Sequence, residues 1–192
     1  MRVKICGITR VKDAMFAEKA GADAVGVVMY SPTSHRSVPE ARAREIFDNL
    51  GPFVTRVIVT HTHSEEDLRR LLTLRPDAIQ ISHPFVFRND PGVRVLRVIG
   101  RGDAVPDDCD ALIVDESMGA GKVFDREFAK SVVKTSAVPV ILAGGLTLEN
   151  VGDAIREIRP YAVDVASGVE TEPGIKDHTK IAAFIAAARE AL

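Results

Sequence analysis

Short apolar segments alternate with amphipathic segments along the whole length of this 192-residue chain. Such alternation is typical of βα repetition, in which helices connect successive strands. Because most of the short segments are rich in Val and Ile, we expect strands that are buried on both faces of a parallel sheet. The expected strands lie near residues 2–6, 24–29, 54–59, 77–81, 93–98, 111–115, 139–143 and 162–166.

Two later segments carry apolar residues at the spacing i, i+3, i+4, i+7, which predicts helices on the outside of the sheet. Thr147 stands where it would cap the first of them, and Ser37 with Glu40 forms a capping box for an earlier helix near 38–49. The two apolar stripes are Val151, Ala154, Ile155 and Ile158, and Ile181, Phe184, Ile185 and Ala188.

Residues 82–110 interrupt the alternation. Successive strands are close together in the sequence there, and His83-Pro84, Asp90-Pro91 and Pro106-Asp107 break any helical pattern. We therefore expect the fourth and fifth connecting helices to be shortened or missing.

Eight parallel strands can form a closed barrel or an open doubly wound sheet. An open sheet of this kind usually has a Gly-rich dinucleotide loop after its first strand, and Cys6-Gly7-Ile8-Thr9 is not such a loop. The favoured α/β fold is a compact (β/α)8 TIM barrel, shorter than the usual ~250 residues. Residues 1–192 are expected to form one domain, since the chain is too short for two ordinary ones.

Composition argues against several classes of function. A formal net charge of -2 provides no basic surface for nucleic acid. The sequence has no signal-peptide pattern and no apolar run long enough to span a membrane, so we expect a cytoplasmic protein without membrane contacts. The only cysteines, Cys6 and Cys109, are far apart and form no CxxC pattern, which argues against a disulfide framework or a thiolate zinc site.

Active sites of such barrels lie at the carboxyl ends of the strands, and Cys6 ends the first strand. The period of two places Val3 and Ile5 toward the helices, so Lys4 and Cys6 point into the barrel. A buried cysteine is often only a small apolar side chain. A cationic neighbour such as Lys4 favours the thiolate, which would make Cys6 a candidate base.

Two carboxylates also occupy strand positions inside the barrel or at its mouth. Asp115 ends the sixth strand and is either a general acid or a loop-closing cap; an acid role near neutral pH requires a raised pKa. Asp164 faces inward from the eighth strand, which is adjacent to the first in a closed barrel. We expect it to pair with Lys4, either as a structural ion pair or as a group that positions a ligand.

Small residues form the loops after the seventh and eighth strands. Glycines let backbone N–H groups approach an anion, and a helix N-terminus adds a partial positive charge. Because barrel enzymes often bind phosphate between these two loops, we expect a phosphorylated small-molecule ligand there. The candidate residues are Gly144, Gly145, Ser167 and Gly168.

After the second strand, Arg36 lies in a polar loop and is either a solvated side chain or a bidentate partner for a carboxylate. After the third strand, His61 and His63 suggest a metal site, but no matched third ligand accompanies them. We therefore predict no metal.

Motifs spread over most of the chain resemble those of the phosphoribosylanthranilate isomerase family. Individually they are modest, but they occur in the order of that family and cover both ends of the sequence. They are Lys4-Ile5-Cys6-Gly7-Ile8-Thr9, Gly21-Ala22-Asp23-Ala24-Val25-Gly26, Ser34-His35-Arg36, Val114-Asp115, Gly119-Ala120-Gly121-Lys122, Phe124-Asp125, Leu142-Ala143-Gly144-Gly145-Leu146, Glu149-Asn150-Val151, Ala162-Val163-Asp164-Val165-Ala166-Ser167-Gly168-Val169-Glu170 and Pro173-Gly174-Ile175-Lys176-Asp177.

The resemblance implies an Amadori rearrangement of N-(5-phosphoribosyl)anthranilate in tryptophan biosynthesis, without a cofactor. It implies that Asp115 is the general acid that opens the sugar ring and that Cys6 is the general base at C2′. Arg36 would hold the anthranilate end, while Asp164 would orient the reacting amine or the sugar hydroxyls. The resemblance leaves open whether the chain is a monomer or a homodimer.

The chain departs from the family pattern near the ends of the third and fourth strands. His83 is displaced by one residue from the histidine of the family, which would reverse the face it presents, and His61 lies where the family often has a different ending. Arg126 replaces a common tryptophan. Two alternatives follow: a related sugar-phosphate isomerase of histidine biosynthesis, and a non-catalytic barrel that binds a phosphorylated ligand.

Overall fold

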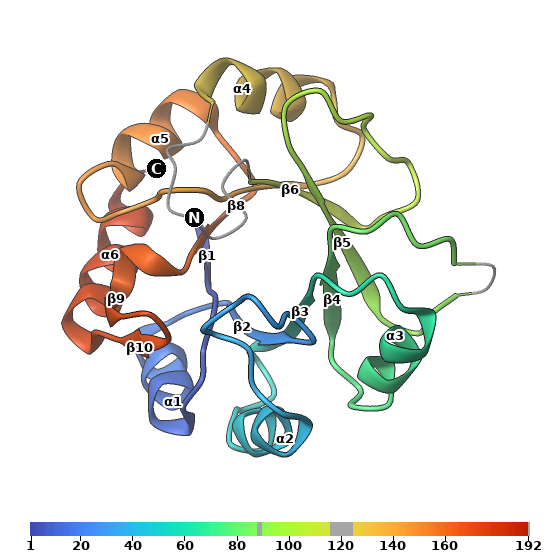
Figure 1. Ribbon diagram of the computed structural model, residues 1–192. Coiled ribbons are helices and arrows are strands. Elements are labelled where there is room, and N and C mark those ends of the chain that lie inside the picture. The colour runs from blue at the N-terminus through green and yellow to red at the C-terminus, as the bar shows by residue number, and fades with distance from the viewer. Residues whose placement is uncertain (88–89, 116–124, 192) are drawn as a thin grey trace.

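The computed structural model describes residues 1–87, 90–115 and 125–191. Eight parallel strands follow one another around a closed barrel, in which the first strand pairs with both the second and the eighth (Figure 1). The (β/α)8 barrel prediction is confirmed, and each strand lies within one residue of its expected ends. The strands are β1 (Arg2–Ile5), β2 (Ala24–Met29), β3 (Thr55–Thr60), β4 (Ala78–Ile81), β5 (Arg94–Ile99), β6 (Ala111–Val114), β7 (Val140–Leu142) and β8 (Ala162–Val165).

Helices surround the barrel on its outside (Figure 1). Both predicted apolar stripes are buried, on α5 (Val151–Ile158) and α6 (His178–Glu190). A short 3-10 helix, η1 (Ser167–Val169), and a small antiparallel pair, β9 (Glu170–Glu172) and β10 (Ile175–Lys176), follow β8. The α-helices are α1 (Val11–Ala20), α2 (Glu40–Asp48), α3 (Glu65–Leu72), α4 (Arg126–Thr135), α5 (Val151–Ile158) and α6 (His178–Glu190). Among the described residues, no helix has the length and apolarity needed to cross a membrane.

The strands separate two apolar clusters. Val3 and Ile5 belong to the larger cluster, which lies between the strands and the helices. Cys6 belongs to a smaller cluster inside the barrel, together with residues such as Ile113 and Ile141. The period of two along β1 therefore turns Lys4 and Cys6 toward the interior, as predicted.

The two proposed side-chain caps are wrong. Helix α2 starts after Pro39 without a side-chain cap, and Glu40 accepts a hydrogen bond from the Tyr30 hydroxyl instead (2.6 Å). Helix α5 starts after Asn150, whose Oδ1 accepts from the backbone N–H of Thr147 (2.8 Å). At α2 the expected capping carboxylate is engaged by Tyr30, and at α5 the helix starts later than Thr147, after Asn150.

The shortened fourth and fifth connections are confirmed, because the described residues between β4 and β6 form no helix. Arg97 on β5 covers part of the space that these missing helices would otherwise fill. Its guanidinium donates to the carbonyls of His83 and Phe85 and pairs with Asp108 (2.6 Å), while the side chain is only 7% exposed. One arginine therefore anchors the loops on both sides of β5.

Replacing Arg97 with methionine should lower the free energy of unfolding by roughly 2–3 kcal/mol, because buried carbonyls lose their donors. Methionine retains most of the apolar stem, so the effect reports mainly on the hydrogen bonds. Urea denaturation measures it. The matched control is Arg94→Met on the same strand, whose partner Asp110 lies at the surface and which should change stability little. Equal effects of the two changes would contradict the anchoring role.

Candidate active site

The barrel interior contains a buried polar cluster of Lys4, Gln80 and Asp164. The β1–β8 register places Lys4 opposite Asp164, and Lys4 Nζ donates to Asp164 Oδ2 (2.7 Å) and to Gln80 Oε1 (2.9 Å). The predicted pairing across the interior is confirmed. Asp164 Oδ1 is buried and has no hydrogen-bond partner among the described residues, which leaves one carboxylate oxygen for a ligand.

A cavity opens at the carboxyl ends of the strands. It brings together side chains from distant parts of the sequence, since its walls come from strands on all sides of the barrel. Of the predicted site residues, the cavity is lined by Cys6, Arg36, Asp115, Gly144, Gly145, Asp164 and Ser167. Lys4 does not line the cavity but is bonded to Asp164, and Gly168 follows Ser167 in the loop after β8.

Cys6 is buried at the floor of this cavity, and its backbone N–H donates to the carbonyl of Val165 (2.8 Å). Burial raises the pKa of the Cys6 thiol, and the negative charge of Asp164 raises it further. Lys4 and Lys176 act in the opposite direction but do not outweigh these effects. The neighbouring Lys4 favours a thiolate as predicted, yet the thiol form dominates at neutral pH.

Asp115 lies directly after β6, and its backbone N–H donates to the carbonyl of Ile99 (3.2 Å). It shares the cavity wall with His61. Burial lowers the pKa of His61, opposed by the charge of Asp115, so that imidazole is neutral near pH 7. His61 Nδ1 lies 3.2 Å from Ser82 Oγ.

No group of three potential metal ligands occurs among the described residues. His63 stacks on His83, with ring centroids 4.6 Å apart. His63 and His83 therefore contact each other, while His61 lines the cavity.

The two candidate phosphate loops touch. Gly144 and Gly145 have positive φ angles of 87° and 61°, a conformation that favours glycine. A Cβ atom on Gly168 would lie only 2.1 Å from the carbonyl oxygen of Leu146, so glycine is required for the loops after β7 and β8 to approach. The two loops, the second of which contains η1, therefore line one side of the cavity.

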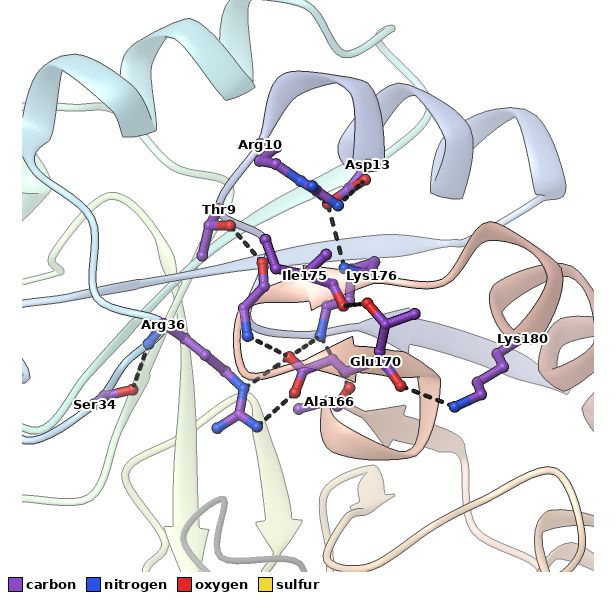
Figure 2. A network of polar contacts seen from close by, with 12 residues as sticks. Thr9, Arg10, Asp13, Ser34, Arg36, Ala166, Glu170, Ile175, Lys176 and Lys180 are labelled. Atoms are coloured by element: carbon purple, nitrogen blue, oxygen red, sulfur yellow. Dashed lines mark hydrogen bonds and ion pairs between the residues drawn. The ribbon is translucent and has the colours of Figure 1, made fainter.

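Arg36 reaches the cavity from the loop after β2, but it already has an internal partner. Its Nε and Nη2 donate to the two carboxylate oxygens of Glu170, at 2.9 and 2.7 Å (Figure 2). Sequence reasoning assigned no role to Glu170 or to Gln80. The Arg36–Glu170 and Lys4–Gln80 contacts each join residues far apart in the sequence. The one available signal for such a role was that Glu170 is a carboxylate that follows a candidate phosphate loop.

The motif at residues 119–122 and Phe124 lie outside the described residues. Asp125 is described: its Oδ1 caps α4 by accepting from the backbone N–H of Phe128 (2.9 Å). Arg126, which differs from the family pattern, pairs with Glu157 on the surface.

A family model described as N-(5'phosphoribosyl)anthranilate (PRA) isomerase matches residues 3–187. The chain belongs to this family. A relative from Methanoregula boonei named N-(5'-phosphoribosyl)anthranilate isomerase is 83% identical over 191 residues, covering 100% of this chain and 98% of the relative. The match favours phosphoribosylanthranilate isomerases over the histidine-biosynthesis alternative, and it identifies the protein as an isomerase.

Solved structures of phosphoribosylanthranilate isomerases have the same fold. The enzyme from Thermus thermophilus is 37% identical with a TM-score of 0.89, and each chain covers 100% of the other. A second structure, described as a complex with reduced 1-(o-carboxyphenylamino)-1-deoxyribulose 5-phosphate, is 34% identical with a TM-score of 0.83 and 99% coverage of both chains. A thiamine phosphate pyrophosphorylase from Pyrococcus furiosus, 15% identical with a TM-score of 0.72, shares only the fold.

Proposed function

We propose that the protein converts N-(5-phosphoribosyl)anthranilate into 1-(2-carboxyphenylamino)-1-deoxyribulose 5-phosphate in tryptophan biosynthesis, by an Amadori rearrangement. The observation that carries this proposal is the single cavity lined by Cys6, Asp115, Asp164 and residues of both glycine-containing loops. Such a cavity would supply an acid and a base for two proton transfers and a place for the phosphate.

In the first step, Asp115 protonates the ring oxygen of the sugar. The bond from C1′ to this oxygen breaks, and the nitrogen lone pair forms an iminium ion with C1′. A positioned general acid accelerates such a step because it stabilises the departing oxygen as charge develops on it.

In the second step, the Cys6 thiolate removes the proton from C2′, and the electrons of that bond neutralise the iminium ion to give an enolamine. Tautomerisation moves a proton to C1′ and leaves a ketone at C2′, so no external oxidant or reductant is needed. The iminium ion lies close to Cys6 and lowers the cost of the thiolate, because an opposite charge favours the ionised form. Acid catalysis therefore prepares the site for base catalysis.

Binding groups at opposite ends of the cavity hold the substrate. Gly144, Gly145, Ser167 and Gly168 surround the phosphate, and the free Oδ1 of Asp164 orients the amine or a sugar hydroxyl. The loop arginine contacts the anthranilate carboxylate. Anchoring both ends keeps C2′ near the base, which reduces the entropy lost in reaching the transition state.

The direct test uses purified protein and freshly generated phosphoribosylanthranilate, whose fluorescence falls on conversion. We expect turnover well above background and complementation of a tryptophan auxotroph. Tight binding of the reduced product analogue without any turnover would instead support a non-catalytic barrel that binds a phosphorylated ligand. Absence of both would contradict the proposal altogether.

We also propose that the enzyme needs no cofactor or metal, because both proton transfers use side chains. The substrate carries a phosphate and a carboxylate and does not cross membranes freely, which supports a cytoplasmic location. A neighbour from Thermotoga maritima is described as monomers of a dimeric enzyme. We propose a monomer or a homodimer here, which light scattering distinguishes.

A further inference from the structure

Glu170 is the centre of a buried network that the proposed chemistry does not use. Besides the two contacts from Arg36, its carboxylate accepts from Lys176 Nζ (2.8 Å) and from the backbone N–H of Gly174 (3.2 Å) (Figure 2). The side chains of Glu170 and Lys176 are 5% and 0% exposed. Four hydrogen bonds to one buried carboxylate fix its position.

The network determines how Arg36 enters the cavity. A Cβ atom on Gly7 would lie 2.4 Å from Arg36 Cδ, so the arginine stem crosses directly over this glycine. Glu170 occupies the edge of the guanidinium formed by Nε and Nη2. The edge formed by Nη1 and the second Nη2 hydrogen is the one left for a ligand carboxylate, since a guanidinium has five donors in a rigid plane.

Arg36 and Lys176 both pair with the single carboxylate of Glu170. Burial lowers the pKa of Lys176, while the charge of Glu170 and its hydrogen bond act in the opposite direction. Burial disfavours ionised Glu170, but the hydrogen bond from Arg36 and the charge of Lys176 outweigh it, and its pKa lies below the ordinary value. Glu170 is therefore ionised near neutral pH.

Lys176 extends the network toward the phosphate loop. Its Nζ also donates to the carbonyl of Ala166 (2.9 Å), the residue before Ser167 (Figure 2). The same buried ammonium group thus contacts Glu170 and the start of η1. The two anion-binding ends of the cavity are connected through protein atoms.

We propose that Glu170 is a positioning residue that holds Arg36 in the orientation required for the aromatic carboxylate of the substrate. This inference rests on the proposed function, because it takes the carboxylate from that substrate. Glu170 does not touch the reacting atoms; it acts through Arg36. Lys176 helps to keep Glu170 ionised.

The test is a double-mutant cycle of Glu170→Gln and Arg36→Met, with the reduced product analogue and a matched analogue that lacks the ring carboxylate. Calorimetry on the full chain measures both affinities. Glu170→Gln should weaken the carboxylate analogue about tenfold, or about 1.4 kcal/mol, and leave the other analogue nearly unchanged. In the Arg36→Met background, Glu170→Gln should have little further effect.

Steady-state kinetics provides a second measurement. Glu170→Gln should raise KM about tenfold and change kcat by less than about threefold, because it removes binding shared by substrate and transition state. The matched control is Lys180→Met, which removes a hydrogen bond to the backbone carbonyl of the same residue (2.9 Å) but leaves the carboxylate intact. It should match wild type.

Equal weakening of both analogues by Glu170→Gln, or an undiminished effect without Arg36, would overturn the positioning role. If Glu170→Gln does not fold, Glu170→Asp replaces it, since the shorter carboxylate keeps the charge but loses the bidentate contact. Failure of the proposed function would be seen separately, as a wild-type protein without turnover. The binding measurements on the two analogues would still test the role of Glu170.

Discussion

Cys6→Ser should lower kcat by about 10²–10⁴-fold, because a serine hydroxyl does not ionise near neutral pH and cannot replace the general base. Serine is nearly isosteric, and the thiol lies on the cavity floor without a role in closing the barrel. Affinity for the reduced product analogue should therefore stay within about threefold of wild type. Stopped-flow fluorescence and calorimetry measure the two quantities. A nearly normal kcat would refute the assignment of Cys6 as base.

The pH dependence gives Cys6 a distinct signature. Because burial and Asp164 raise its pKa above the ordinary 9.0, the free enzyme gains thiolate as the pH rises, and kcat/KM should increase throughout the neutral and mildly alkaline range. This limb should disappear in Cys6→Ser. Cys109→Ser is the matched control: that thiol is half-buried and lies outside the cavity, so its loss should change neither the rate nor the profile.

Asp115→Asn should also reduce kcat by about 10²–10⁴-fold, because an amide cannot protonate the ring oxygen. Asparagine has nearly the same shape, and the backbone contact from this residue to Ile99 does not depend on the side chain. Asp153→Asn, an exposed carboxylate on α5, should leave the rate unchanged. Equal activity of Asp115→Asn and wild type would rule out the acid role.

A substrate deuterated at C2′ distinguishes the two defects. In Cys6→Ser, proton removal from C2′ becomes rate-limiting, so the deuterium isotope effect on kcat should be large. In Asp115→Asn, ring opening becomes rate-limiting, and the same isotope effect should approach unity. The reverse pattern would mean that the two roles are exchanged.

Strand periodicity was sufficient to predict the interior of the barrel. Apolar runs located all eight strands, and alternation along the first strand turned Lys4 and Cys6 inward. Because the first and last strands are adjacent in a closed barrel, a contact between Lys4 and Asp164 could be predicted, and the structure confirms it. These features follow from the repeat of the fold and therefore need no knowledge of side-chain packing.

Other features depend on packing and were missed. The partner of Arg36 is Glu170, 134 residues later in the chain, and no local pattern connects them. Gln80 accepts a hydrogen bond from Lys4 across the barrel, and no local pattern connects these two residues either. The sequence also left the thiol pKa of Cys6 open: Lys4 is nearby as expected, but its effect is exceeded by burial and by Asp164.

Barrel closure has a kinetic consequence for the appearance of activity. The hydrogen bonds between β1 and β8 join residues 160 positions apart, as in the pair Lys4 and Asp164. Ordering so long a loop costs conformational entropy before any contact compensates for it, and contacts of this kind usually slow folding. The proposed base and the carboxylate that orients the substrate meet only when this seam forms. A refolding chain should therefore gain activity only once this long-range step is complete, rather than gradually.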